Sequence, residues 1–260
     1  MEGIPHFIYT DHTTQTNLLY PNINPKQYIC SKRFIEKCEF KIYQDATMIF
    51  TFGSLPYYSL INQYKIPAEK VMTVFLGCNV SNDYFENPKK YTSRNILFVG
   101  AAWERKGGPM LIEVFKNVLN RYPDSTLTIV GCKPGNITVP NCNILGKIPL
   151  KSLSEHYNSA NVFCLPTLKE PFGAVFIEAM NYRLPVIANN IGCLSDLVTN
   201  DFNGYLINNN VNDYTKAICS LFENPEKCKI MGENGYQYAR SKFTWQQVGK
   251  KIRTSIDKYL

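Results

Sequence analysis

The chain has 260 residues, of which 45% are hydrophobic and 19% are charged. These proportions allow a normal buried core and exclude a disordered chain, and the length leaves room for one large domain or two small ones. A formal charge of +7 suits an anionic ligand such as a nucleotide, a nucleic acid or an acidic membrane surface, and does not choose among them. A solvated basic surface is the plainer interpretation of the same surplus.

The cysteines and the lack of long apolar runs in the sequence predict the cellular compartment of the protein. Nine cysteines are scattered along the sequence without a C-x-x-C pair, which argues against a zinc site or a disulfide framework. Reduced, partly buried thiols are typical of a cytoplasmic protein, so we expect that localisation. No apolar stretch approaches the ~18 residues needed to span a bilayer. The opening residues, MEGIPHFIYTDHT, lack the basic segment and apolar core of a signal peptide.

The first 88 residues predict an incomplete α/β domain. Strands are expected at 6–10, 47–52 and 71–75, with helices at 26–44 and 54–65 between them. Three strands form a thin sheet with an exposed edge, which natural domains usually avoid. The polar, turn-rich stretch SNDYFENPKK at 81–90 then marks a domain boundary.

The predicted helix at 26–44 carries basic residues at helical spacing. One stripe holds Lys26, Arg33, Lys37 and Lys41, and the opposite side holds Ile35, Cys38 and Ile42. A helix of this kind could dock on an anionic membrane, where each cation contributes ~1 kcal/mol. An ordinary solvated face is the alternative.

After residue 90, predicted strands alternate with predicted helices. The strands are expected at 96–100, 127–131, 143–145, 162–166, 185–188 and 205–207. The helices are expected along Leu111, Phe115, Val118 and Tyr122, then at 153–160, around Glu178 and at 194–198. This alternation predicts a parallel sheet with helices on both faces.

The C-terminal tail predicts an amphipathic helix. Thr244 and Gln247 form a capping-box signature at its start. Its apolar stripe is expected to consist of Trp245, Val248, Ile252, Ile256 and Tyr259.

Several common nucleotide and metal motifs are missing from the sequence. It contains no G-x-x-x-x-G-K-[ST] P-loop and no G-x-G-x-x-G after a strand. It also contains no D-x-D triplet, so no metal-chelating acidic pair is expected at a nucleotide-sugar diphosphate. His6 and His156 offer no functional signal, whereas His12 in YTDHT directly follows a predicted strand, where loops carry function.

The segment VGAAWERKGG at 99–108 indicates a phosphate site. A strand ends at Gly100, the cations Arg105 and Lys106 follow, and two glycines open a helix. Free N–H groups at a helix N-terminus, together with a guanidinium and an ammonium group, bind phosphate well. An exposed basic turn is the alternative interpretation of this segment alone.

The segment TLKEPFGAVFIEAMNYRLPV at 167–186 supplies two carboxylates. Gly173 allows backbone N–H groups to approach a phosphate or sugar closely. Side chains on a helix lean toward its N-terminus, so Glu178 is expected to point toward the carboxyl end of the sheet, where Glu170 lies. Carboxylates accept hydrogen bonds, and a vicinal diol presents two donors. Backbone N–H groups that can bind a phosphate, beside two carboxylates that can accept hydrogen bonds from diols, indicate a sugar-nucleotide ligand.

The motif order makes this indication specific. The order FVG…ERKGG…TIVG…LG…Y..A.VF.LP….EPFG.VF.EAM…PV.A…G…D.V….NG is similar to the donor domain of the retaining family-4 glycosyltransferases, which have the GT-B fold. The similarity covers residues 71–260. It implies an α/β, GT-B-type chain with two Rossmann-like domains, of which the C-terminal one is complete and the N-terminal one is partial.

The resemblance also implies the roles of individual residues. Glu170 would hold the transferred sugar, Glu178 the ribose and Lys106 the pyrophosphate, while His12 would contact the sugar from the N-terminal domain. The implied catalytic residues are therefore Glu170, His12 and Lys106. The implied donor-binding residues are Arg105, Lys106, Gly107, Ile148, Glu170, Phe172, Gly173, Ala174, Val175 and Glu178.

The expected domains are 1–88, the second half of the acceptor-side domain; 89–240, the nucleotide-sugar domain; and 241–260, a helix that crosses back to the first domain. Three positions depart from the family pattern. Ala101 stands where an arginine is usual, and Arg183 and Cys193 stand where glycines are usual. We expect Arg105 to replace the cation missing at position 101.

The implied reaction is transfer of a sugar from a nucleoside-diphosphate sugar to a hydroxyl acceptor on a glycan, lipid or protein. It would proceed with retention of configuration and without a metal or cofactor. Nucleic acid is not an expected partner, while a peripheral membrane contact and a partner chain completing the N-terminal domain stay open. The sequence does not indicate the sugar, the base or the acceptor.

Two other classes of function remain. One is a non-catalytic or fragmentary nucleotide-sugar-binding chain that needs a partner to complete the cleft. The other is a GT-B-fold epimerase acting on the same donors. Epimerases need catalytic carboxylates and histidines inside the cleft, and the three histidines here are too few and poorly placed.

Overall fold

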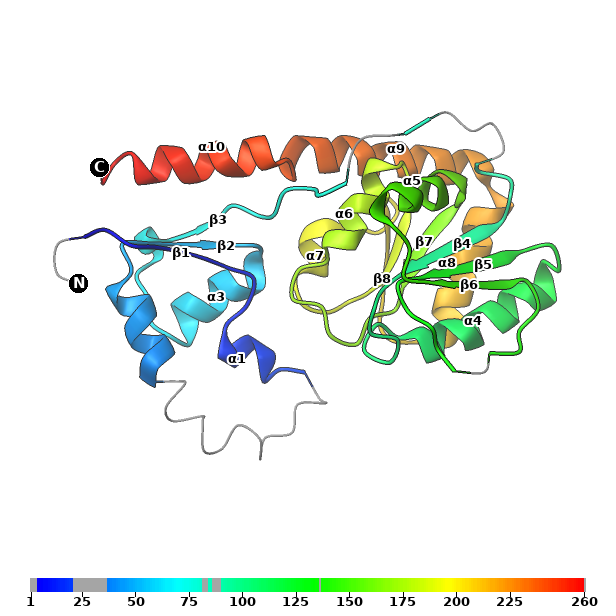
Figure 1. The fold of residues 1–260 in the computed structure, drawn as a ribbon, viewed down its shortest axis with the longest axis horizontal. Helices are drawn as coiled ribbons and strands as arrows, with labels where there is room; N and C mark the ends of the chain where they lie inside the picture. The colour runs from blue at the N-terminus through cyan, green and yellow to red at the C-terminus, as the bar shows by residue number, and fades with distance from the viewer. Residues whose placement is uncertain (1–3, 21–36, 81–83, 86–89, 136, 260) are drawn as a thin grey trace. The chain divides into compact units, whose positions relative to one another are not determined.

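The computed structural model describes residues 4–20, 37–80, 84–85, 90–135 and 137–259, shown as a ribbon in Figure 1. The chain forms two compact units. Unit 1 consists of Met1–Gly77 and Lys242–Leu260, and unit 2 of Cys78–Ser241. The units divide after residues 77 and 241, where the sequence predicted divisions after residues 88 and 240.

Unit 1 is built on a three-stranded parallel sheet in the order β1-β2-β3. The strands are β1 (Phe7–Thr10), β2 (Met48–Thr51) and β3 (Val71–Thr73), at the three places that the sequence predicted. All residues of the central strand β2 are buried, because both faces of the sheet are covered. Successive side chains of a strand point to opposite faces, so β2 serves two separate cores.

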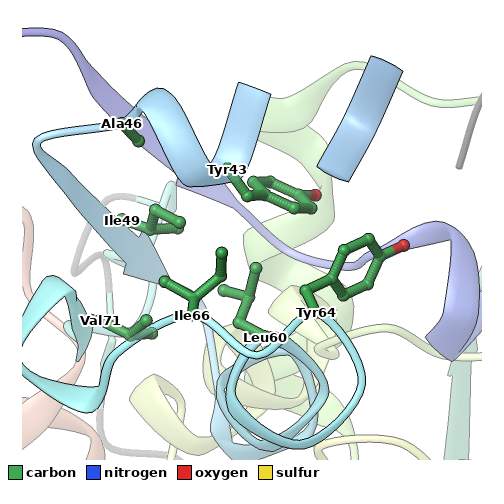
Figure 2. Close-up of a cluster of buried hydrophobic side chains, with 7 residues drawn as sticks. All are labelled: Tyr43, Ala46, Ile49, Leu60, Tyr64, Ile66 and Val71. Carbon is green, nitrogen blue, oxygen red and sulfur yellow. The ribbon is translucent and has the colours of Figure 1, made fainter. Parts of the chain in front are cut away.

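The first core of unit 1 lies between the sheet and its N-terminal helices. Figure 2 shows its buried side chains, which are Tyr43, Ala46, Ile49, Leu60, Tyr64, Ile66 and Val71. They come from the helical residues 37–45, the connection between that helix and β2, the sheet, α3 (Ser54–Asn62) and the segment that follows α3. A short helix, α1 (Thr14–Asn17), and a 3-10 turn, η1 (Ala68–Lys70), complete this side of the unit.

The second core of unit 1 uses the C-terminal helix α10 (Trp245–Ile256). Met48 and Phe50 of β2 pack with the buried Val248 of α10, and Ile252 and Ile256 lie against this cluster. The Thr244 side chain accepts a hydrogen bond from the backbone N–H of Gln247, which confirms the predicted start of the helix. Residues far apart in sequence thus form one core.

One prediction about a helix face in unit 1 is wrong for two of its residues. Trp245 and Tyr259 were expected in the buried stripe of the tail, yet 47% and 45% of their surfaces are exposed. Cys38 and Ile42, which the sequence placed opposite the basic stripe, are exposed, whereas Tyr43 and Phe40 of the same helix contribute to the first core. Within the described residues, no helix has both the length and the apolar character to cross a membrane.

The basic stripe predicted at 26–44 is described only in part. Lys37 and Lys41 are exposed on the helical residues 37–45, while Lys26 and Arg33 lie outside the described residues. Docking of this helix on a membrane stays a prediction. The second helix of this region, α3, ends at Asn62 rather than at residue 65.

Unit 2 is built on a six-stranded sheet in the order β6-β5-β4-β7-β8-β9, in which all neighbours run parallel. Its strands are β4 (Asn95–Val99), β5 (Thr126–Val130), β6 (Cys142–Gly146), β7 (Val162–Leu165), β8 (Val186–Asn189) and β9 (Gly204–Ile207). Every residue of β7 and β8 is buried. Their continuous apolar runs are typical of a sheet covered on both faces.

In the described part of unit 2, the strands are connected and covered by the helices α4 (Gly108–Arg121), α5 (Leu150–Ser159), α6 (Ala174–Asn181), α7 (Leu194–Leu197), α8 (Val211–Glu223) and α9 (Pro225–Lys242). Helices α4 and α8 pack against each other. Helix α4 connects β4 to β5, and α6 connects β7 to β8, so the two connections lead from the middle of the sheet toward opposite edges. Right-handed crossovers therefore place α4 and α6 on opposite faces.

Helices α8 and α9 were not predicted from the sequence. The signal for α8 was present, because its buried residues Tyr214, Ile218 and Leu221 recur at helical spacing after the N-cap Asn210. Helix α9 begins with a proline and is polar along most of its length, so its apolar face is weak. The remaining strands and helices of unit 2 confirm the predicted order of elements.

Candidate functional site

The order of the strands in unit 2 identifies where a ligand would bind. From β4 the chain proceeds outward through β5 and β6, and then returns to the other side of β4 to add β7, β8 and β9. The sheet therefore changes direction between β4 and β7. In open α/β sheets, ligands bind outside the carboxyl ends of the strands at such a switch point.

The loop after β4 is bent so that it lies on the loop after β7. Gly107 adopts a left-handed conformation, with φ of 74°, directly before α4. A Cβ atom at this position would lie 1.8 Å from the backbone oxygen of Pro166, so no larger residue fits. This close approach explains why a glycine follows the two cations.

Hydrogen bonds join the two loops along their length. The backbone N–H of Leu168 donates to the carbonyl oxygen of Arg105 at 2.9 Å. In return, Nη1 of Arg105 donates to the carbonyl oxygen of Lys169, also at 2.9 Å. The Thr167 hydroxyl lies within hydrogen-bond distance of both carbonyl oxygens, at 3.3 and 3.0 Å. The cation-bearing loop and the glutamate-bearing loop are therefore held together by their backbones.

This pairing brings together the two residues with the strongest predicted roles. The Lys106 ammonium forms an ion pair and a hydrogen bond with Oε2 of Glu170, and both residues are buried. They come from loops that follow neighbouring strands and are separated by 64 positions in the sequence. A buried charge needs such a partner, because transfer of an isolated ion out of water is very costly.

The start of α6 presents free backbone N–H groups at the same end of the sheet. Gly173 precedes the helix with φ of 105°, and a Cβ atom there would lie 2.7 Å from Cδ2 of Leu194. Ala174 and Val175 form the first turn, and the Phe172 side chain is buried. The unpaired N–H groups of a helix start favour an anion such as phosphate.

Glu178 lies one turn further along α6 and is partly buried. The Tyr157 hydroxyl of α5 donates a hydrogen bond to its Oε2 atom at 3.1 Å. Burial raises the pKa of the Glu178 carboxyl, and the hydrogen bond from Tyr157 opposes this increase. The structure shows no hydrogen bond between Glu178 and the Lys106–Glu170 pair, so the two glutamates have separate partners.

Arg105 and Ala101 are both exposed on the loop after β4. In the described part of the chain, Arg105 forms no ion pair with the neighbouring Glu104, so its charge is not neutralised there. Sequence reasoning did not single out Lys169, a third cation whose backbone Arg105 contacts. Burial lowers the pKa of Lys169, and the charge of Arg105 lowers it further.

The two other departures from the family pattern have structural explanations. Arg183 adopts a left-handed conformation, with φ of 54°, which suits the glycine usual at this position. Its guanidinium group lies 4.0 Å from the ring centres of Tyr84 and of Tyr236, and its Nε donates to Glu233 at 2.7 Å. Cys193 has a negative φ, so its backbone does not require glycine.

The two remaining predicted residues belong to other elements of the fold. Ile148 is partly buried in the connection between β6 and α5. His12 belongs to unit 1, where it follows β1, and its Nδ1 lies 2.5 Å from Oδ1 of Asp11. The described residues contain no group of three or more His, Cys, Asp or Glu side chains arranged to hold a metal ion.

Known relatives share both the sequence pattern and the fold. Residues 80–238 match the family described as glycosyl transferases group 1. An uncharacterized glycosyltransferase of Methanocaldococcus jannaschii is 31% identical over 194 residues, which are 71% of this chain and 52% of that protein. A D-inositol 3-phosphate glycosyltransferase of Corynebacterium kroppenstedtii is 24% identical over 245 residues, or 83% of this chain and 54% of that protein.

Solved structures resemble nearly the whole chain. The Anabaena protein HepE in complex with UDP has a TM-score of 0.81 and 15% identity, covering 98% of this chain and 72% of that one. Sucrose-phosphate synthase from Thermosynechococcus elongatus has a TM-score of 0.77 and 20% identity, covering 97% of this chain and 67% of that one. At these identities the likeness shows the fold, and it confirms the predicted GT-B-type α/β architecture.

The chain spans about half the length of the curated relatives that it matches. The family match nevertheless extends over more than half of the chain and includes β4, β7 and α6, with both glutamates and the cation loop. The predicted family is thereby confirmed: the chain belongs to the glycosyl transferases group 1 family.

Proposed function

We propose that this chain acts in the transfer of a sugar from a nucleoside-diphosphate sugar to a hydroxyl acceptor, as a retaining, metal-independent glycosyltransferase of family 4. The observation that carries the proposal is the buried Lys106–Glu170 pair at the switch point of the sheet. A cation for the diphosphate and a carboxylate for the sugar stand side by side there. The UDP complex of the similar HepE protein supports a nucleoside diphosphate as ligand.

The charges of this site suit the charge that develops during transfer. As the bond between the sugar and the diphosphate breaks, negative charge grows on the leaving phosphate. Lys106, Arg105 and the N-terminus of α6 would stabilise that charge, and such electrostatic stabilisation usually contributes more to catalysis than any other effect. The acceptor oxygen forms the new bond to the sugar, and its proton passes to the leaving phosphate.

The Lys106–Glu170 pair also suggests how the donor binds. A diphosphate can take the place of the Glu170 carboxylate on the Lys106 ammonium. The sugar hydroxyls can then donate to the released carboxylate, so that neither buried charge loses its partner. Glu178 would accept hydrogen bonds from the ribose diol. His12 is proposed as the contact from unit 1 to the sugar.

The two glutamates can be separated by calorimetry with a free nucleoside diphosphate and with the matching sugar nucleotide. Glu178→Ala should weaken both ligands by about 1.5–3 kcal/mol, the scale of charge-assisted hydrogen bonds. Glu170→Ala should weaken the sugar nucleotide more than the free diphosphate. Equal losses for both ligands in the Glu170 variant would contradict its role at the sugar. A screen of common sugar nucleotides should precede the test and identify the donor.

A second candidate is a chain that binds the donor without completing the reaction. The uncharged Ala101, where the family pattern has an arginine, favours it. On this basis we expect the 260-residue chain alone to bind a nucleoside diphosphate and to transfer sugar poorly. Robust transfer to an added acceptor by the purified chain would exclude the second candidate.

A further inference from the structure

Tyr157 of α5 is a buried tyrosine whose hydroxyl meets the carboxylate of Glu178. The residue has no exposed surface, and its hydroxyl donates to Oε2 of Glu178 at 3.1 Å. Its ring stacks on Tyr182, which follows α6, with ring centres 5.1 Å apart and planes 10° apart. The aromatic ring thus lies between the helix that carries it and the helix that carries Glu178.

The backbone of Tyr157 is also held in place. The buried Lys90 ammonium donates to the carbonyl oxygen of Tyr157 at 3.1 Å and to that of Asn158 at 3.4 Å. These carbonyls belong to the last turn of α5, where backbone oxygens have no helical partner and favour a cation. The Tyr157 hydroxyl therefore reaches Glu178 from a position fixed by packing on one side and by hydrogen bonds on the other.

Only one of the two Glu178 oxygens is engaged in this way. In the described part of the chain, Oε2 accepts the bond from Tyr157, and Oε1 has no hydrogen bond to another residue. The last torsion of a glutamate is broad, so an unheld carboxylate rotates easily. A partner that binds one oxygen and leaves the other available reduces this freedom, as outer hydrogen bonds do for metal ligands.

We propose that Tyr157 is a positioning residue, which holds the Glu178 carboxylate in the orientation that accepts hydrogen bonds from the ribose diol of the donor. The inference rests on the proposed role of Glu178 in binding the nucleotide. Tyr157 acts through Glu178 and does not itself touch the ligand. It adds a residue of α5 to a binding site otherwise made of loops after β4 and β7 and of α6.

The ionisation of the neighbouring groups is consistent with this role. Burial raises the pKa of the Tyr157 hydroxyl well above its usual value, so it remains a donor at neutral pH. Burial raises the pKa of the Cys78 thiol to about 11, and the charge of Glu178 contributes to this increase. Arg240 of α9 faces that thiol, and Tyr182 faces the ring of Tyr157. The Tyr157 hydroxyl therefore favours the ionised carboxylate against the effect of burial.

The test compares a nucleoside diphosphate that has ribose hydroxyls with one that lacks them. Uridine diphosphate and 2′,3′-dideoxyuridine diphosphate are titrated by calorimetry into the whole chain and into Tyr157→Phe. In wild type the ribose form should bind more tightly. In Tyr157→Phe this preference should fall by about fivefold to tenfold, the effect of one hydrogen bond, while the affinity for the dideoxy form stays unchanged.

The pH dependence provides a second readout. Without the Tyr157 hydroxyl, the pKa of Glu178 should rise. As the pH is lowered, Glu178 should therefore become protonated sooner in Tyr157→Phe, and the ribose preference should disappear at a higher pH than in wild type. The matched control is Tyr214→Phe. Tyr214 of α8 is also fully buried, and its hydroxyl has no hydrogen-bond partner among the described residues, so its removal should change neither the preference nor its pH profile.

The outcomes separate the inference from the function on which it rests. If wild type binds both diphosphates equally, Glu178 does not hold the ribose, and the proposed function and this inference both fail. If wild type discriminates and Tyr157→Phe discriminates equally well, only the inference fails. Equal weakening of both ligands in Tyr157→Phe would indicate a merely structural role and would also overturn it.

A double-mutant cycle tests whether Tyr157 acts through Glu178. Glu178→Gln keeps the shape of the side chain and removes its charge. In the Glu178→Gln background, Tyr157→Phe should leave the remaining ribose preference unchanged, because the two residues act through one contact. A further loss in the double variant would show that Tyr157 acts independently of Glu178, which contradicts the inference.

Discussion

Both units carry a carboxylate paired with a nitrogen-containing side chain just after the carboxyl end of a parallel strand, and the two pairs differ in burial. In unit 2 the side chains of Lys106 and Glu170 are 11% and 9% exposed. In unit 1 those of His12 and Asp11 are 46% and 39% exposed. The first pair joins two loops from the middle of a six-stranded sheet, and the second lies within one loop after the edge strand β1.

The difference in burial changes what each pair does for the molecule. Removing one partner of a buried pair leaves an uncompensated charge and costs about 3–5 kcal/mol. An exposed pair contributes about 0.2–1 kcal/mol, because water screens it. The same kind of position therefore carries a buried structural pair at the proposed binding site of unit 2 and an exposed pair in unit 1. The two tryptophans, Trp103 in unit 2 and Trp245 in unit 1, allow each unit to be followed separately.

The largest effect should come from Lys106→Ala. The change leaves the Glu170 carboxylate buried without its cation, so unit 2 should lose about 3–5 kcal/mol of unfolding free energy. Nucleoside diphosphate binding should be lost as well. Urea unfolding followed by Trp103 fluorescence, in a Trp245→Phe background, measures the stability of unit 2 alone.

The control for this experiment is the double variant Lys106→Met, Glu170→Met. Apolar side chains in place of both charges should restore most of the stability but none of the binding, since a buried pair is often replaceable by apolar groups. If Lys106→Ala leaves unit 2 as stable as wild type, the pair is not buried in solution and the comparison between the units fails.

A smaller effect is expected for Arg105→Ala, which tests whether this residue replaces the cation missing at position 101. Its exposed guanidinium already donates to the Lys169 carbonyl and is near the proposed diphosphate site. Loss of one charge-assisted hydrogen bond should weaken a nucleoside diphosphate by about 1.5–3 kcal/mol. The affinity for the bare nucleoside, measured by the same calorimetry, should not change.

Adding Ala101→Arg to this variant should restore part of the lost affinity. An unchanged diphosphate affinity in Arg105→Ala would instead mean that the chain lacks a second phosphate cation. That result would favour the candidate function without catalysis.

The buried Lys90 should make the stability of unit 2 depend on pH. Burial lowers its pKa from 10.5 to about 7. Between these values the unfolded chain binds a proton that the folded chain does not, so this residue makes stability rise with pH. The increase is at most about 1.4 kcal/mol per pH unit. Above about pH 9, the thiols of Cys164 and Cys228 oppose it, since burial raises their pKa values.

The measurement is the urea stability of unit 2 at pH 7, 8 and 9, followed by Trp103 fluorescence in wild type and in Lys90→Met. Subtraction of the two profiles isolates the contribution of this lysine. The wild-type profile should be the steeper one. Parallel profiles would show that the Lys90 ammonium is solvated, and that α5 is held in another way.

The smallest effect is expected for Asp11→Asn in unit 1. The hydrogen bond with His12 lowers the pKa of Asp11 below its usual 3.8. A lowered pKa contributes stability that is present above pH 4 and is lost as the pH falls through the lowered value. Asp11→Asn should therefore cost less than about 1 kcal/mol at neutral pH. Trp245 fluorescence in a Trp103→Phe background reports it, and a larger loss would mean that the pair is shielded from water.

Sequence patterns predicted most of the fold because they depend on short-range spacing. The buried runs of β4, β7 and β8 appear as continuous apolar segments, and the spacing in α4 matches one helix face. The same patterns failed where an element is polar or where its buried face depends on a distant partner. Helix α9 has a weak apolar face, and Trp245 remains half exposed although it fits the stripe of α10.

The sequence by itself determined the family, most of the order of strands and helices along the chain, and most of the residues proposed for the candidate site. Glycines, cations and glutamates at fixed spacing carry that information locally. Only the tertiary structure decided which of them meet. Lys106 contacts Glu170, Glu178 contacts Tyr157, and the second core of unit 1 is closed by a helix from the other end of the chain. Such contacts depend on the order of strands in the sheet, and spacing along the chain does not encode that order.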